Sequence, residues 1–220
     1  MAKPASRVLR TGGLWFNGID GYVRIPSFTR PQSFTILIRA SLRTTDSENP
    51  GVSMFPVEFS ICFWRRMRFN AWTTEDWKSV FSPFISWNTN WWYFVGVSFN
   101  ASAQTVAFYR DLEVYGPYSY PYTIRELPSC IDIGKRGTAA YYVGCLDEVL
   151  IYNRVLSDAE RYEIYSKGTF IKDGLVLYLP FYEGEGNIAH DVSGYNNHGT
   201  IYGGTAWVVK KALRVLPKAR

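Results

Sequence analysis

A period-two alternation of side chains, repeated in short runs, is the feature that most constrains the fold. In one run, Phe34, Ile36, Ile38 and Ala40 alternate with Ser33, Thr35, Leu37 and Arg39. This period places successive side chains on opposite faces of a β-strand. Turn signals separate the runs, as where Asn17-Gly18 and Asp20-Gly21 lie between residues 14–16 and 22–25. The chain is therefore expected to form many short antiparallel strands.

The same reading predicts further strands along the chain. Their ranges are 57–63, 67–72, 91–99, 105–109, 130–134, 141–152, 175–181 and 200–202. Residues 100–103 are expected to join strand 91–99 to strand 105–109 as a hairpin. The Tyr- and Pro-rich residues 115–128 contain Pro117, Pro121 and Pro128, which favour an irregular surface loop or an edge over a central strand.

One short helix interrupts this pattern and is predicted over residues 157–166. Ser157 suits the N-cap, and Glu160 stands three residues later, as a capping box requires. Asp158 in the first turn suits the helix dipole, and Lys167-Gly168 supplies the stop. Many short strands with Gly and Pro turns and one late helix favour an all-β, two-sheet sandwich.

Length and composition limit the class of protein. The 220 residues suit one domain, and the net charge of +5 with a pI of about 9.0 is mild. Aromatic residues make up 17% of the chain, which fits a thick core or an aromatic surface for sugars or partner proteins. We find no nucleic-acid-binding motif, no apolar run long enough to span a membrane and no secretory signal.

The three cysteines, Cys62, Cys130 and Cys145, contain no CxxC pair, so a zinc site of that kind is not expected. Because their number is odd, at least one is free or pairs between chains. They do not form a disulfide framework, so the cysteines do not indicate whether the protein works in an oxidising or a reducing compartment.

Two regions carry a family resemblance. Residues 144–160, GCLDEVLIYNRVLSDAE, resemble the pattern G-x-I-D-E-V-R-I-Y-N-R-A-L-S-x-x-E of laminin-G-like (concanavalin-A-like) domains from bacteria and archaea. Residues 92–97 resemble the W-x-H-V-A-V strand of that family, and residues 106–112 its partner strand, with Arg110-Asp111 in place of the usual Asn-Gly turn. The resemblance implies a two-sheet antiparallel jelly-roll sandwich. Residues 43–87 show no reliable correspondence.

The order of segments is rotated relative to that family. Residues 173–187 and 191–200 look like its opening segments, which usually precede the part that begins here at residues 14–18. We therefore predict a single domain over residues 1–220 in which residues 173–216 supply strands that usually come first. Termini that lie close together make such a permutation tolerable. A second, incomplete domain, or strand exchange with a neighbouring subunit, remains an alternative.

Enzymes on this sandwich are mainly glycoside hydrolases, which need two carboxylates across a cleft. No E-x-D-x-x-E run is present, and the adjacent Asp147 and Glu148 are expected on opposite faces of their strand. Asp147 would then share a face with Val149 and Ile151 as a buried structural acid. A Ser-His-Asp triad is disfavoured because both histidines, His190 and His198, lie in one segment. We expect no catalytic residues.

The resemblance also implies calcium at the sheet rims, since Ca²⁺ takes oxygen ligands from acids and carbonyls. The acids that lie in family-like motifs are Asp20, Asp147 and Asp191, and they are the candidate metal ligands. The candidate sugar-stacking residues are aromatics expected to be exposed in loops: Trp77, Trp87, Tyr115, Tyr118, Tyr120 and Tyr122. The alternative is that these aromatics cap the ends of the sandwich.

The sequence thus predicts a non-catalytic recognition module that binds carbohydrate or the surface of a cell or particle. Its partner would be a glycan or a surface protein, at an extracellular, cell-surface or virion-surface location. A structural or assembly component of a virion, fibre or surface layer, with self-association, is the alternative. It is motivated by the rotated strand order and the unpaired cysteine. A hydrolase is the least favoured reading.

Overall fold

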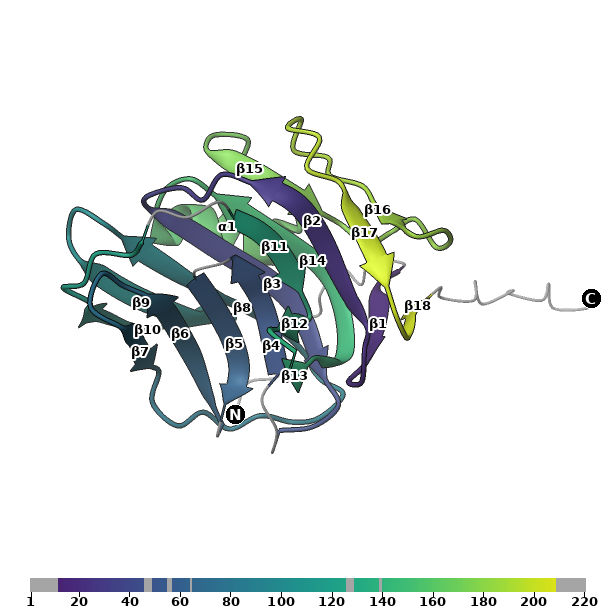
Figure 1. Cartoon of the computed structure of the whole chain (residues 1–220), viewed down its shortest axis with the longest axis horizontal. Helices are drawn as coiled ribbons and strands as arrows, with labels where there is room; N and C mark the ends of the chain where they lie inside the picture. Colours follow the sequence, from purple (N-terminus) through teal and green to yellow (C-terminus); the bar gives the residue numbers. More distant parts are fainter. Residues whose placement is uncertain are drawn as a thin grey trace, which may run out of the picture.

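In a computed structural model, the described part of the chain forms two eight-stranded antiparallel sheets, a small two-stranded sheet and one helix (Figure 1). The structure describes residues 12–45, 49–54, 57–63, 65–125, 129–138 and 140–208. The expected two-sheet sandwich with a single late helix is confirmed.

The first sheet is built around the long strand β14. Its order is β10 (Glu113–Ser119), β9 (Thr105–Arg110), β8 (Trp92–Asn100), β3 (Phe34–Leu42), β14 (Val143–Tyr152), β1 (Leu14–Asn17) and β18 (Thr205–Trp207). One further strand, β15 (Leu175–Leu179), also pairs with β14. Strand β14 therefore pairs with β1 through its first residues and with β15 through its last.

The second sheet carries the remaining long strands. Its order is β16 (Ile188–Ala189), β17 (Gly199–Tyr202), β2 (Tyr22–Phe28), β11 (Ser129–Ile133), β4 (Asn49–Met54), β5 (Val57–Phe63), β6 (Arg66–Trp72) and β7 (Trp77–Phe81). A small hairpin of β12 (Lys135–Arg136) and β13 (Ala140–Tyr141) follows β11.

The core lies between the sheets and follows the period-two pattern. Ile36 and Ile38 of β3 are fully buried, as are Phe59 and Phe69 of the opposite sheet. Burying a side chain of this size contributes about 1.5–3 kcal/mol, so the interleaved apolar faces hold the two sheets together.

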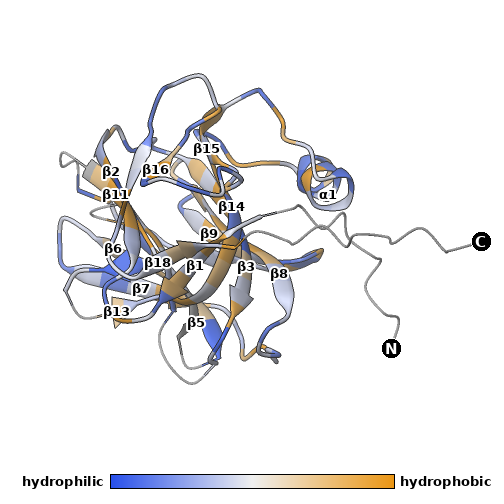
Figure 2. Ribbon diagram, turned by 90° about the vertical axis from the view of Figure 1, so that its right-hand side faces the viewer, coloured by the Kyte–Doolittle hydropathy of each residue, from blue (hydrophilic) through white to orange (hydrophobic). Residues whose placement is uncertain are grey.

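Helix α1 (Asp158–Lys167) covers the outer face of the first sheet. Its N-terminus has the predicted capping box of Ser157 and Glu160, and it ends at Gly168 in the left-handed conformation. Hydrogen bonds from Arg154, and then from the Ser157 backbone, lower the pKa of Glu160 to about 2. Ile164 of the helix joins a second apolar cluster on this face of the sheet. Figure 2 shows the resulting order of layers, with the first sheet between the helix and the second sheet.

The C-terminal strands pair within the chain in this structure. Strand β15 pairs with β14, β17 with β2, and β18 with β1. The segments that resemble the opening of the family thus contribute to both sheets. The domain boundaries themselves stay a prediction.

The expected orientation of Asp147 is wrong, because β14 has a bulge between Leu146 and Glu148. A bulge inserts one extra residue and shifts the alternation of faces. Asp147 and Glu148 consequently both approach Arg39, at 3.7 Å and 2.9 Å, instead of pointing to opposite faces. Asp147 is buried as expected, but Val149 belongs to the core on the other side of the sheet.

Part of the Tyr- and Pro-rich segment forms β10, which lies at the edge of the first sheet, so the prediction of a loop or an edge is confirmed there. Cys130 and Cys145 are free, and the side chain of Cys62 lies outside the described residues. Within the described part of the chain, no helix has the length and apolar character needed to cross a bilayer.

Candidate functional site

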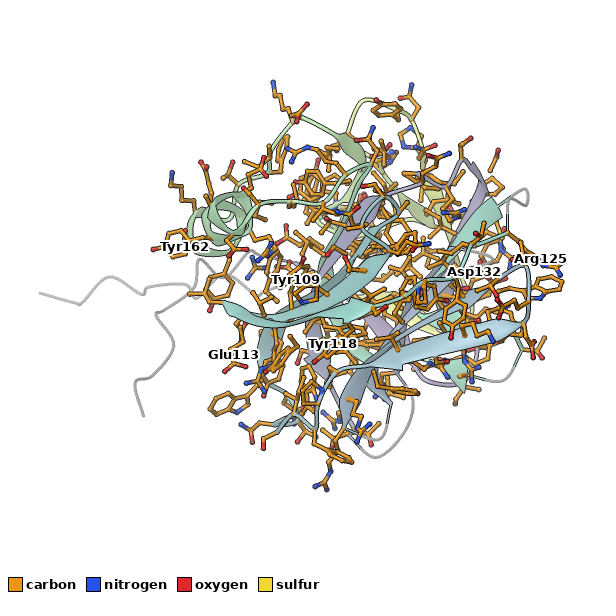
Figure 3. All side chains as sticks on the ribbon, turned by 90° about the vertical axis from the view of Figure 1, so that its left-hand side faces the viewer. Tyr109, Glu113, Tyr118, Arg125, Asp132 and Tyr162 are labelled. Carbon is orange, nitrogen blue, oxygen red and sulfur yellow. The ribbon has the colours of Figure 1, made fainter. Side chains whose placement is uncertain are left out.

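The outer face of the second sheet lies on the side of the molecule away from helix α1 (Figure 2). Alternation along β2 places Val23 and Ile25 in the core and therefore turns Tyr22 and Arg24 outward. We call the outward side chains of this sheet the distal face. Figure 3 shows Asp132 and Arg125 on this side of the protein and Tyr162 of the helix on the opposite side.

A row of polar residues crosses the distal face from strand to strand. The strand registers align Thr200, Arg24, Asp132, Ser53, Glu58, Asn70 and Ser79. Since neighbouring strands lie about 4.8 Å apart, the row places polar groups at regular intervals, of which Arg24 is half-exposed whereas Asp132 and Asn70 are buried.

Side-chain contacts fix both halves of this row. Arg24 donates from Nε and Nη2 to the two carboxylate oxygens of Asp132, each at 2.7 Å. This hydrogen bonding raises the pKa of Arg24 above its usual range. In the other half, Ser79 Oγ donates to Asn70 Oδ1 at 2.9 Å, and Asn70 Nδ2 donates to Glu58 Oε2 at 3.3 Å. The row is therefore pre-organised.

Two aromatic pairs, each with one exposed ring, flank the row. Tyr22 and Tyr202 stack with ring centroids 4.9 Å apart, and Lys135 Nζ lies 4.1 Å from the centroid of Tyr22. Trp72 and Trp77 stack at 6.2 Å with an interplanar angle of 12°. Tyr202 is 43% exposed and Trp77 is 41% exposed, so each pair presents an aromatic surface to solvent.

The registers place the two pairs on opposite sides of the polar row. On β6, Trp72 lies two residues from Asn70, on one side of the row. On β2, Tyr22 lies two residues from Arg24, on the other side of the row, which is the side where β6 carries Arg68. Strands β2 and β6 are four strand spacings apart in the sheet, which is about 19 Å. The distal face thus has aromatic groups at two diagonal positions with polar groups between them.

The structure separates the six aromatics predicted to contact a ligand. Trp77 lies on the distal face. The expectation that Tyr120 is exposed is wrong, because this side chain is fully buried and its hydroxyl donates to the Lys78 carbonyl at 3.0 Å. Burial raises the pKa of Tyr120. Tyr118 and Tyr122 are half-buried and pack against Phe108 and Tyr120, respectively.

Trp87 and Tyr115 lie elsewhere, at the edge formed by β9 and β10. Trp87 packs edge-on against Tyr93 at 5.0 Å, with the Arg110 guanidinium 5.7 Å from its ring centroid. Tyr115 is half-buried and donates its hydroxyl to Glu113. Burial, followed by this hydrogen bond, raises the pKa of Tyr115 to about 12. As ligand contacts, Trp87 and Tyr115 stay predictions.

The three predicted calcium ligands serve the chain itself. Asp191 accepts from the backbone N–H groups of Tyr178, Ser193 and Asn197 at 2.9–3.0 Å. Asp20 accepts from the Asn17 side chain at 2.8 Å and from the Gly204 backbone at 2.9 Å, and Asp147 faces Arg39. Among the described residues, no three His, Cys, Asp or Glu side chains are grouped so that they could hold a metal ion.

Sequence reasoning missed most of the distal face. Alternation of Tyr22 and Arg24 with apolar residues was a visible signal that these two side chains point outward. The pairing of Tyr22 with Tyr202, however, depends on the contact between β2 and β17, which are far apart in the sequence.

A family model described as the concanavalin A-like lectin/glucanases superfamily matches residues 17–160. The match includes residues 43–87, for which sequence reasoning found no correspondence. No curated protein matches the chain significantly.

Solved structures support the fold at low sequence identity. A candidate carbohydrate-binding protein from Bacteroides ovatus superimposes with a TM-score of 0.68 at 16% identity, over 92% of this chain and 60% of that protein. The chain thus spans less than two thirds of that protein. A heptameric SAP-like pentraxin from Limulus polyphemus superimposes with a TM-score of 0.59 at 13% identity, over 78% of this chain and 93% of the pentraxin chain. The CBM40 of a Ruminococcus gnavus IT-sialidase, solved with α2,3-sialyllactose, superimposes with a TM-score of 0.57 at 12% identity, over 70% of this chain and 96% of the CBM40 chain.

Proposed function

The chain belongs to the concanavalin A-like lectin/glucanases superfamily, and from this premise we propose that it is a non-catalytic carbohydrate-binding module whose ligand lies on the distal face. The similar Bacteroides ovatus and CBM40 structures support this class of function.

The observation that carries the proposal is the pair of aromatic stacks, each with one exposed ring, on either side of a pre-organised polar row. Aromatic faces provide apolar area for the C–H groups of sugar rings, and the charged and amide groups between them bind hydroxyls. Because Tyr22 and Trp72 lie on strands about 19 Å apart and on opposite sides of the polar row, contact with both pairs requires an oligosaccharide.

The carboxylates on the distal face support binding over hydrolysis. Asp132 is paired with Arg24 at 2.7 Å, and Glu58 lies 3.6 Å from Arg68. A glycosidase needs one carboxyl group that carries a proton to the leaving oxygen. In the polar row, Asp132 and Glu58 instead each lie against a guanidinium group.

Substitution of the exposed aromatics tests the proposal. A glycan array identifies a ligand, and calorimetry then compares the Trp77→Ala and Tyr202→Ala variants with Tyr162→Ala. Tyr162 is the matched control because it is 56% exposed but lies on the helix, on the opposite side of the protein (Figure 3). Loss of one stacking ring should weaken the binding free energy by about 1 kcal/mol, which raises Kd about fivefold.

Two results would refute this assignment. The first is an array on which the wild-type protein binds no glycan. The second is a Kd that is unchanged in Trp77→Ala and Tyr202→Ala but raised in Tyr162→Ala. Urea unfolding of all three variants verifies that they are folded.

A glycan ligand implies an extracellular, cell-surface or particle-surface location, which antibody labelling of intact cells or particles tests. The alternative role as an assembly component with self-association also stays a prediction. It requires a species larger than the 25.2 kDa monomer in light scattering.

A further inference from the structure

A hollow at one end of the sandwich lies where three connecting segments meet. These are the loop between β2 and β3, the turn between β8 and β9, and the segment after β10. We call this hollow the end pocket. Its volume is about 170 Å³, and a cavity of about 150 Å³ is enough for one benzene ring. The end pocket therefore admits one six-membered ring, and any further part of a ligand stays outside it.

The lining of the end pocket combines apolar and polar side chains. Phe99, Ala101 and Ile124 form the apolar part, and Phe99 and Ile124 belong to the buried core. Four polar side chains with no formal charge also line the pocket: Gln32, Gln104, Tyr122 and Thr123. Such a lining suits a ligand that has one apolar face and a polar periphery.

The polar side chains of the end pocket are available to a ligand. Gln32 and Gln104 are the two glutamines of the chain, and both line the pocket. Among the described residues, neither amide makes a side-chain hydrogen bond, and the hydroxyl groups of Tyr122 and Thr123 make none. An amide offers an acceptor oxygen and two N–H donors, so each glutamine can bind neighbouring hydroxyl groups.

Hydrogen bonds between the three segments hold the walls in place. The Ala101 N–H donates to Ser33 Oγ at 3.0 Å, which ties the turn between β8 and β9 to the loop before β3. The Tyr120 N–H donates to the Gln104 carbonyl at 2.7 Å, which ties the segment after β10 to the same turn. A site whose walls are held before the ligand arrives spends less binding free energy on ordering.

Tyr122 is the aromatic residue of the lining, and its ring is held by neighbours. It packs edge-on against the buried Tyr120 with ring centroids 5.2 Å apart, and Lys78 Nζ lies 4.9 Å from its centroid. The next residue is also fixed, because the Thr74 N–H donates to the Thr123 carbonyl at 3.0 Å. Tyr122 is one of the aromatics that the sequence predicts as sugar contacts, and the end pocket gives it a position for that role.

The guanidinium of Arg30, which also lines the end pocket, serves the protein itself. Arg30 is 9% exposed, and its Nη1 donates to the Pro31 carbonyl at 3.0 Å. The other polar groups of the lining are amides and hydroxyls, which match hydroxyl groups that both donate and accept. A polyhydroxylated ring fits this set, with its C–H face against the apolar part of the lining.

We propose that the end pocket holds one neutral pyranose residue, with Gln32 and Gln104 binding its hydroxyl groups and Tyr122 beside the ring. The lining comes from β8 and from connecting segments, so this site is separate from the distal face. The inference therefore does not depend on the function proposed above.

The test titrates the isotope-labelled, full-length protein with methyl glycosides of glucose, galactose, mannose, xylose and N-acetylglucosamine. Methyl glucuronide and methyl galacturonide are the charged analogues, in which a carboxylate replaces the hydroxymethyl group of the matching neutral sugar. NMR spectra follow the side-chain amide signals of Gln32 and Gln104, which the variants below assign. At least one neutral glycoside should shift both signals, and neither uronide should bind more tightly than it does.

Variants locate the site, and the remaining glutamine signal reports Kd in each. Gln32→Ala removes one amide. Gln104→Asn shortens the other, and asparagine tolerates the left-handed backbone of this residue, whose φ is 53°. Each should raise Kd about fivefold through the loss of a hydrogen bond. Asn187→Ala, the matched control, removes an exposed amide beside β16, at the opposite edge of the second sheet from β7, and should leave Kd unchanged, as should Trp77→Ala.

Three outcomes would overturn the inference. They are the failure of every neutral glycoside to shift the two glutamine signals at tens of millimolar, tighter binding of a uronide than of every neutral glycoside, and an unchanged Kd in both glutamine variants. Urea unfolding verifies that each variant is folded.

The same measurements separate the end pocket from the distal face. Weaker binding in Trp77→Ala, with both glutamine variants unaffected, would place the sugar on the distal face, which contradicts the end pocket but supports the proposed function. Weaker binding in the two glutamine variants alone supports the end pocket, whatever the distal face binds.

Discussion

The buried charge cluster on the outer face of the first sheet should respond very differently to removal of its cation and of one of its anions. Arg39 is 5% exposed and Glu148 is 1% exposed. Arg39 Nε donates to Glu148 Oε1 at 2.9 Å and lies 3.7 Å from Asp147 Oδ2, so one cation faces two carboxylates. The Tyr178 hydroxyl also donates to Glu148, at 3.2 Å.

The two substitutions leave different charges behind. Arg39→Met leaves two buried carboxylates without their guanidinium, which should cost at least about 3–5 kcal/mol of unfolding free energy. Glu148→Gln leaves the pair of Arg39 and Asp147 in place and keeps an oxygen for Tyr178. It should cost about 1–3 kcal/mol, as expected for a weakened buried hydrogen bond.

Urea unfolding followed by tryptophan fluorescence at pH 7 measures both costs. At pH 5 the deficit of Arg39→Met should shrink, because a buried carboxylate that has lost its guanidinium takes up a proton more readily than the same group in the unfolded chain. A loss in Glu148→Gln that equals or exceeds the loss in Arg39→Met would refute the reasoning, as would a deficit of Arg39→Met that is independent of pH.

Three further predictions concern the scaffold. Because the pKa of Glu160 is lowered to about 2 by Arg154, the stability that this carboxylate contributes is present above pH 4.5 and lost as the pH falls towards 2. Glu160→Gln should remove this dependence, as seen by urea midpoints at pH 5 and pH 2.5. Gly144→Ala should lower the free energy of unfolding by more than about 3 kcal/mol, because its Cβ would lie 2.1 Å from the Ser41 carbonyl oxygen. Gly137 also has a positive φ but lies in open space, so Gly137→Ala should lower it by about 1–2 kcal/mol in the same assay. Leu177→Ala in β15 should lower the main unfolding transition by about 2–5 kcal/mol, and an unmoved transition would show that the C-terminal strands form a separate unit.

Local sequence signals predicted the elements whose stability is local. The helix was placed to within one residue because Ser157, Glu160 and Gly168 act through their own neighbours in sequence. The turn after β1 was likewise readable, since Asn17 Oδ1 accepts from the N–H groups of residues 19–21. In both cases the residues that form the signal also make the contacts.

Features set by pairing between distant strands were not readable. The bulge at Asp147 depends on how β14 meets β3, and it reverses the face expected from simple alternation. Tyr120 follows β10 in a loop, but its side chain is fully buried against Phe69 and Phe99, which come from different strands. The candidate site was the hardest part to predict, because Tyr22 and Tyr202 become neighbours only through the pairing of β2 with β17.

The pairing of the first strands with the last ones has a consequence for biosynthesis. Strands β1 and β2 receive their partners β18 and β17 only after about 180 further residues have been translated. At roughly 5–20 residues per second, the ribosome needs about 10–40 s to deliver them. During that interval the nascent chain carries unpaired edges at the start of both sheets, open to pairing with other chains. A factor that shields these edges during translation should therefore raise the yield of native protein.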